Sequence, residues 1–179
     1  MIKKLVLVTI IGIVIGATVF SGCIQSGTGQ LVLKITDDPD LNISKANVTF
    51  SMVTVHLGIF ENDSGNETNG TAGWYTVVNT TQTFDLIALQ DVTALWGSAN
   101  LSAGWYTQIR LYVDEAVLTI DGIEYNCTIP SHVIKLIKPF NITANETTTL
   151  ILDFDVQKSV HETGNGKYIF KPTIKVIQE

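Results

Sequence analysis

The chain has 179 residues, 45% of them hydrophobic, and its 17 acidic residues outnumber its 11 basic residues. This length allows one domain with its own core and leaves no room for two domains of ordinary size. The formal net charge of −6 argues against nucleic acid as a partner, because no basic face is available to neutralise phosphates.

Residues 1–22 are predicted to form a lipoprotein-type signal peptide. Lys3 and Lys4 precede an uncharged run from Leu5 to Phe20, which Ser21-Gly22-Cys23 follows. A basic start, an apolar stretch and small residues at a cleavage site are typical of secretory signals. The apolar run is shorter than the roughly 20 residues that span a bilayer. An uncleaved N-terminal anchor is the alternative interpretation.

The segment Phe20-Ser21-Gly22-Cys23 resembles a lipobox, in which cleavage before the cysteine leaves a thiol that carries lipid. We therefore expect a lipid on Cys23, a flexible tether over residues 23–30 and one domain over residues 31–179. Such a domain would lie outside the cell at the outer face of the membrane, with a net charge of −8 once residues 1–22 and their two lysines are removed. Cys127 then has no disulfide partner, and we expect it to be buried.

Asparagine occurs 11 times, and ten of these residues begin an Asn-x-Ser/Thr triplet. Chance would supply roughly two. The excess predicts dense N-glycosylation, and together with the lipobox it indicates an archaeal cell surface. The alternative is a threonine-rich β protein that carries unmodified triplets. The candidates are Asn42, Asn47, Asn62, Asn66, Asn69, Asn79, Asn100, Asn126, Asn141 and Asn145.

From residue 31 onward, alternation of apolar and polar residues predicts strands. The apolar phase slips after Met52, which predicts a bulge in a long strand. Residues 61–73 read as a surface loop, and the helical spacing within residues 83–95 predicts one or two turns of helix. On the strand 105–113, alternation predicts that Trp105 shares the face of Ile109 and Leu111.

Asp121-Gly122 between two apolar runs predicts a two-residue hairpin turn. This turn pairs Ile120 with Ile123 and places Asn126 outside and Cys127 inside. A last strand is expected over residues 167–177. Altogether the pattern predicts an all-β fold: a single antiparallel β-sandwich of about 8–9 strands with one short helical segment.

A short stretch occurs twice, as NGTAGWYT at residues 69–76 and NLSAGWYT at residues 100–107. Similarity stops after each copy, so the repeat predicts one local device used twice rather than a duplicated domain. Two interpretations stay open for its aromatic residues: anchors of the sandwich core, or an exposed platform for stacking on sugars. The residues concerned are Trp74, Tyr75, Trp105 and Tyr106.

The acidic turn at Asp37, Asp38 and Asp40 offers oxygen ligands to Ca²⁺, with Asp153 or Asp155 from a neighbouring strand as further candidates. A solvated turn without metal is the alternative. The sequence contains no nucleophile elbow, zinc-protease motif, phosphate-binding loop or Cys-x-x-Cys. We therefore predict a protein that is not an enzyme and has no cofactor other than calcium.

Several segments of the chain carry a family resemblance: Phe84–Leu89, Ala103-Gly104, Tyr106–Leu111, Asp121-Gly122, Ile134–Leu136, Leu152–Asp155, Lys158–Val160, Tyr168 and Lys171-Pro172. Together they are similar to one family, the exported archaeal and bacterial lipoproteins of domain of unknown function 4382. The resemblance implies the fold and the cellular location but no activity. The segment Ala-Gly-x-Tyr-Thr, where a strand begins, also resembles the start of a strand in prealbumin-like sandwiches. A prealbumin-like or immunoglobulin-like arrangement is therefore expected.

Two functions are therefore expected. The first is a non-enzymatic, N-glycosylated cell-surface lipoprotein that contributes to envelope structure or adhesion, with an envelope protein or glycan as partner. The second is an extracellular carbohydrate- or calcium-binding module.

Overall fold

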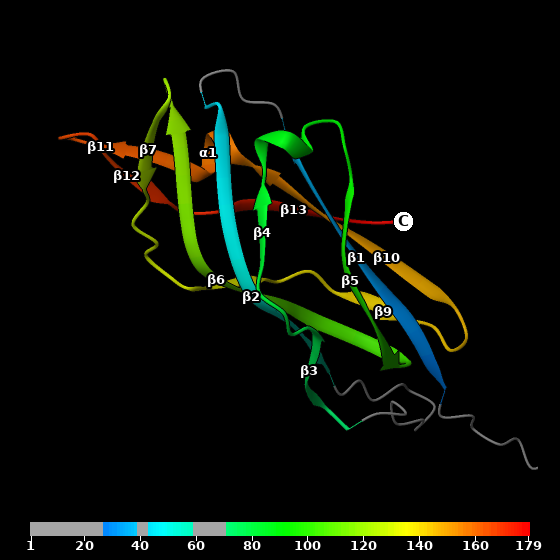
Figure 1. The fold of residues 1–179 in the computed structure, drawn as a ribbon. Helices are drawn as coiled ribbons and strands as arrows, with labels where there is room; N and C mark the ends of the chain where they lie inside the picture. The colour runs from blue at the N-terminus through cyan, green and yellow to red at the C-terminus, as the bar shows by residue number, and fades with distance from the viewer. Residues whose placement is uncertain (1–26, 39–42, 59–70) are drawn as a thin grey trace, which may run out of the picture.

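A computed structural model describes residues 27–38, 43–58 and 71–179 of the chain. The fold is all-β: two larger sheets, each made of strands from distant parts of the sequence, and one small hairpin (Figure 1). The predicted signal peptide, Cys23, Asp40, Asn42 and the loop that carries Asn62, Asn66 and Asn69 lie outside the described residues.

The first sheet has the strand order β13-β10-β1-β5. Its strands are β1 (Thr28–Asp38), β5 (Ala94–Ser102), β10 (Thr147–Asp155) and β13 (Thr173–Gln178).

The second sheet has the order β3-β2-β6-β7, with β4 paired to β2 and with β8 and β9 paired to β6. Its strands are β2 (Lys45–Leu57), β3 (Gly73–Val78), β4 (Gln82–Asp85), β6 (Gly104–Ile120), β7 (Ile123–Asn126), β8 (Val133–Leu136) and β9 (Phe140–Ile142).

The small hairpin consists of β11 (Val160–Thr163) and β12 (Lys167–Phe170). It lies beside β7 (Figure 1). The rings of Tyr125 on β7 and Tyr168 on β12 meet edge to face, with their centroids 5.0 Å apart. The described helical turns are η1 (Ile87–Leu89) and α1 (Val156–Ser159).

The core lies between the inner faces of the two larger sheets. In the long strands of both sheets, alternate residues point inward, as the period of two requires, and in β1 these are Leu31, Leu33 and Ile35, each fully buried. Phe50 of β2 joins the sheets, because its ring lies 4.6 Å from that of Trp96 on β5 and 5.7 Å from that of Phe154 on β10. The predicted sandwich is therefore confirmed.

Two local predictions are also confirmed. The pairing of β2 with β6 shifts register around Phe50 and Met52, so the long strand bulges where the apolar phase slips. In the hairpin, Ile120 pairs with Ile123, and both Asp121 (φ 51°) and Gly122 (φ 78°) adopt the left-handed conformation that a two-residue turn requires. Asn126 is exposed, as the register predicts.

Three other predictions need correction. The described part of the chain contains thirteen strands rather than eight or nine. Strands β1 and β10 run parallel, because the whole second sheet separates them in sequence and no short turn imposes antiparallel pairing. The expected last strand is two strands separated by Lys171-Pro172. The expected short helical segment is present as the single 3₁₀ turn η1 between β4 and β5.

Candidate functional site

The repeated aromatic segment places its two tryptophans on the surface and its two tyrosines toward the core. Trp74 is 40% exposed and Trp105 is 47% exposed, whereas Tyr106 is fully buried and Tyr75 is half-buried against the core. The predicted inward direction of Trp105 is therefore wrong. The pairing of β6 with β2 shifts register at Thr107, so Tyr106 and Ile109 both point inward although they are three residues apart.

The interior position of Tyr106 removes it from any sugar-stacking surface. Its ring stacks on that of Phe140 at 5.3 Å, and its hydroxyl donates a hydrogen bond to the carbonyl of Ser102. Burial, reinforced by the neighbouring Tyr75, raises the pKa of Tyr106 to about 12. Of the four aromatic candidates, Trp74 and Trp105 are the ones that can present a ring to a ligand.

Trp74 borders an open hollow on the outer face of the second sheet, where β3, β2 and β6 lie side by side. The same hollow is lined by His56 of β2 and by Thr107, Gln108 and Arg110 of β6. His56 pairs directly with both Trp74 and Gln108 across the sheet, which brings these side chains to one face. The alternate residues of β2, Val55 and Leu57, point to the other side of the sheet and are buried in the core.

Contacts within the hollow hold its side chains in defined positions. The guanidinium carbon of Arg110 lies 3.8 Å from the centroid of the Trp74 ring, a cation–π contact. The Nε–H of Arg110 donates to the Oε1 of Gln108 at 3.0 Å. The His56 ring lies 4.9 Å from that of Trp74, and its Nδ1 is 3.1 Å from the Thr107 hydroxyl.

Sequence reasoning had found Trp74 but not His56, Gln108 or Arg110. Alternation along β6 already placed Gln108 and Arg110 together on the polar face. The missing information was which strands flank β6, because its partner β2 is distant in sequence: His56 pairs with Gln108 although 52 positions separate them.

The candidate glycosylation residues that the structure describes all reach the surface. Asn79, Asn100, Asn126 and Asn145 are exposed, and Asn47 and Asn141 are half-buried. Asn145 adopts a left-handed conformation (φ 61°) in the turn before β10. None of these six asparagines is buried in the folded domain.

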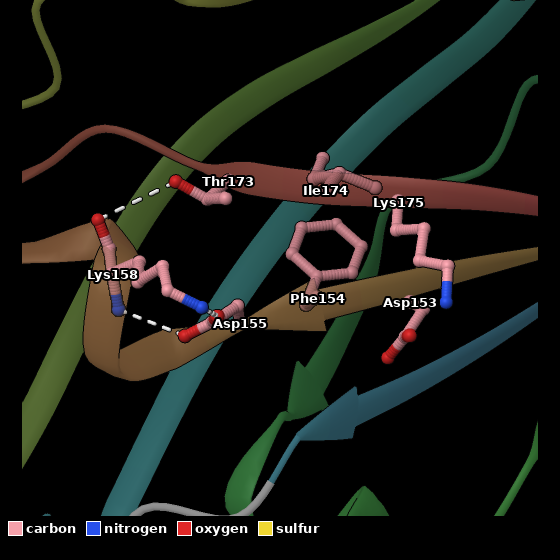
Figure 2. Close-up of a pocket in the computed structure, with 7 residues that line it drawn as sticks. All are labelled: Asp153, Phe154, Asp155, Lys158, Thr173, Ile174 and Lys175. Carbon is pink, nitrogen blue, oxygen red and sulfur yellow. Dashed lines mark hydrogen bonds and ion pairs between the residues drawn. The ribbon is translucent and has the colours of Figure 1, made fainter.

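The predicted acidic calcium site is adjacent to β10, as expected, and the carboxylates of Asp37 and Asp155 already have protein partners. The side chain of Asp38, like Asp40, lies outside the described residues. Asp37 is buried and its Oδ1 accepts the backbone N–H of Val156 at 3.1 Å. One carboxylate oxygen of Asp155 accepts the backbone N–H of Lys158, and the other forms an ion pair with the ammonium group of Lys158 (Figure 2). Over residues 27–38, 43–58 and 71–179, no three acidic, histidine or cysteine side chains gather around a common point.

The shallow hollow of Figure 2 is bordered by Asp155, Lys158 and Thr173, with the carbonyl of Lys158 accepting from the Thr173 hydroxyl. Ser159 also connects this end of β10 to the start of β13. Its hydroxyl donates to the carbonyl of Asp155 and accepts the backbone N–H of Thr173. These hydrogen bonds join α1 to β13, so the side chains that border this hollow have a structural role.

Cys127 is half-buried and forms no disulfide. Burial raises the pKa of its thiol to about 11. At neutral pH the thiol is therefore protonated, and it packs against the core as a small apolar group.

Comparison with known proteins gives one match. The family model "Domain of unknown function (DUF4382)" matches residues 28–172, so the chain belongs to this family. No curated protein and no solved structure matches. In the described part of the chain, no helix is long and apolar enough to cross a membrane.

Proposed function

We propose that this member of the DUF4382 family is a non-enzymatic, N-glycosylated lipoprotein of the cell surface that contributes to envelope structure or adhesion. In this proposal the lipid on Cys23 holds the domain at the outer face of the membrane. A second chain or glycan of the envelope is the partner.

The observation that carries the proposal is the position of the glycosylation candidates. Ten of 11 asparagines lie in acceptor triplets, and the six that the structure describes lie on strands or turns of both sheets without one being buried. A core asparagine in such a triplet would have been an accident of composition. Surface positions throughout are what repeated modification of a folded domain requires.

The proposal also implies an orientation of the domain at the membrane. The backbone N–H of Ala103 donates to the carbonyl of Gly27, so the start of β1 lies beside the start of β6. Only four residues separate Cys23 from Thr28, the first residue of β1. This end of the sandwich would therefore face the membrane, and the junction of β1 with α1 would face away.

The test is the intact mass of the full chain purified from its native membrane, before and after chemical deglycosylation. We expect the mass of the chain from Cys23 onward, increased by lipid and by several glycans that deglycosylation removes. Peptide mapping should place glycans on the exposed residues Asn79, Asn100 and Asn126. An unmodified chain that retains residues 1–22 would contradict the proposal.

A second function, binding of extracellular carbohydrate, is favoured by one further observation. Both exposed tryptophans of the repeat lie on the second sheet, and Trp74 borders a hollow lined with hydroxyl, amide and guanidinium groups. Aromatic rings beside polar side chains can pack on the apolar face of a sugar while hydrogen-bonding its hydroxyls.

This second function is tested by titrating the full chain, purified in detergent, with a panel of oligosaccharides and following heat by calorimetry. Trp74→Ala should abolish binding. Ile137→Ala, which truncates an exposed apolar side chain outside any strand, is the control and should have no effect. Equal binding by both variants would contradict a role for Trp74.

A further inference from the structure

The hollow beside Trp74 contains the only arginine in the sequence, in a chain with an excess of acidic residues. Arg110 is stacked on Trp74 and hydrogen-bonded to Gln108, so its guanidinium plane is fixed in direction. One nitrogen of the guanidinium is used by Gln108, which leaves its two terminal nitrogens as donors. A planar fork of this kind matches a carboxylate with two parallel hydrogen bonds.

Among the residues that the structure describes, no acidic side chain forms an ion pair with Arg110. In the part of the chain that the structure describes, the ion pairs are Lys34 with Glu179 and Lys158 with Asp155, both outside this hollow. Along β6 the next acidic residue is Asp114, four positions or about 13 Å away, and its carboxylate accepts the Ser51 hydroxyl.

A second cation lies directly opposite Arg110. Lys135 of β8 is its partner in the β6–β8 pairing and is exposed. Directly opposed like charges destabilise a sheet, so this pair has a cost that an anion bound between or above the two side chains would offset. Two independent features, the unneutralised arginine and the opposed lysine, thus favour an anionic ligand.

The polar and aromatic side chains form a continuous stripe across four strands. It runs from Trp74 on β3 through His56 on β2 and Arg110 on β6 to Lys135 on β8. Three strand spacings of about 4.8 Å make it about 14 Å long. This length suits several linked units better than one small anion, and the Thr107 hydroxyl and Gln108 amide are suited to sugar hydroxyls.

We propose that this stripe binds an acidic saccharide, with Arg110 and Lys135 holding the carboxylate of a uronic-acid unit and Trp74 bordering the neighbouring sugar. The proposal rests on the carbohydrate-binding function and names its ligand class. It does not depend on glycosylation or lipidation of the chain.

The test compares the same oligosaccharide with its carboxyl groups ionised and with them neutralised as methyl esters. The full chain, purified in detergent, is titrated by calorimetry with oligogalacturonate and with the same oligosaccharide after methyl esterification. We expect the free acid to bind at least tenfold more tightly, because hydrogen bonds to a charged group are stronger than neutral ones. Raising the salt concentration should weaken binding of the acid only.

Charge-removing variants assign the interaction to residues. Arg110→Gln should weaken oligogalacturonate binding at least tenfold, and Lys135→Gln by about threefold because its ammonium is more exposed. The matched control is Lys45→Gln, which removes the same charge from an exposed position at the other end of β2. Arg110→Lys keeps the charge but loses the planar fork, and should bind less tightly than the parent chain. Unchanged thermal unfolding of each variant shows that the fold is intact.

The outcomes separate this proposal from the function on which it rests. Equal binding of the acid and the ester, unaffected by Arg110→Gln, would overturn the acidic-saccharide proposal and leave carbohydrate binding in place. Binding of neither ligand, nor of any other saccharide, would overturn both. Binding of phosphatidylglycerol vesicles instead of saccharide, lost in Arg110→Gln, would make the stripe a membrane contact and also overturn the proposal.

Discussion

The two Gly-Trp-Tyr-Thr segments share a local geometry and differ in how deeply they are buried. In both copies the glycine adopts a backbone conformation favoured by glycine, with φ 154° at Gly73 and 150° at Gly104. In both, the tryptophan points outward and the tyrosine hydroxyl donates to the carbonyl four residues upstream, Thr71 or Ser102. This last contact resembles the tyrosine corner of other sandwiches.

The difference between the copies comes from their strands. Tyr106 belongs to β6, which is paired on both sides, and it is fully buried against Phe140. Tyr75 belongs to β3, at the edge of the sheet, and is half-buried. Local sequence therefore sets the direction of each side chain, whereas the position of the strand in the sheet sets how much each tyrosine contributes to stability.

Truncating the tyrosines should show the largest difference. Tyr106→Ala removes a fully buried ring and should lower the free energy of unfolding by about 3–5 kcal/mol. Tyr75→Ala should cost less than half as much, because the ring is half-exposed in the folded protein. Denaturant titration of the full chain in detergent measures both values. Equal losses would show that β3 is as well packed as β6.

The glycines should give a smaller effect. A side chain at either position is strained by the positive φ, so Gly104→Ala and Gly73→Ala should each cost about 1–3 kcal/mol. No heavy atom lies within 4 Å of the Cβ that an alanine would place at Gly73, so backbone strain alone acts there. The change at Gly104 should be the larger, because β6 cannot adjust without disturbing β2 and β9. Thermal unfolding compares them, and a neutral Gly73→Ala would contradict the strain argument.

Removing only the hydroxyl, as in Tyr106→Phe or Tyr75→Phe, should lower the free energy of unfolding by about 1 kcal/mol each. Tyr106→Phe should also change how stability responds to alkaline pH. The pKa of Tyr106 is raised to about 12 in the folded protein, above about 10 in an unfolded chain. Between these values the folded state keeps a proton that the unfolded state releases, so stability falls as pH rises from about 10 to 12. Tyr106→Phe should make this fall shallower. Tyr75→Phe is the control for loss of a hydroxyl, and identical slopes in parent and Tyr106→Phe would refute the assignment.

The parts of the fold that sequence predicted were those governed by near neighbours. Alternation identified the buried phase of β1, and Asp121-Gly122 determined the register of its hairpin. The direction of Trp105 was mispredicted because the bulge at Thr107 depends on pairing with β2 rather than on the sequence of β6.

The candidate site was predictable only in its aromatic part. Trp74 stood out because its segment is repeated. Arg110 and Lys135 are each ordinary polar positions on a strand, and their significance appears only when β8 is found beside β6. The parallel pairing of β1 with β10 escaped prediction for the same reason, since it joins two ends of the domain.

The outward direction of both tryptophans is open to a test that leaves stability nearly unchanged. The third tryptophan, Trp96, is buried in the core beside Phe50 and serves as an internal reference. Acrylamide should quench the fluorescence of the parent chain strongly. It should quench that of the Trp74→Phe, Trp105→Phe double variant only weakly, because Trp96 alone remains. Each single variant should be intermediate, and Trp74→Phe should also cost about 0.5–1 kcal/mol through the weakened contact with Arg110. Strong quenching in the double variant would mean that Trp96 is accessible, and the contrast between inward and outward aromatics drawn above would then fail.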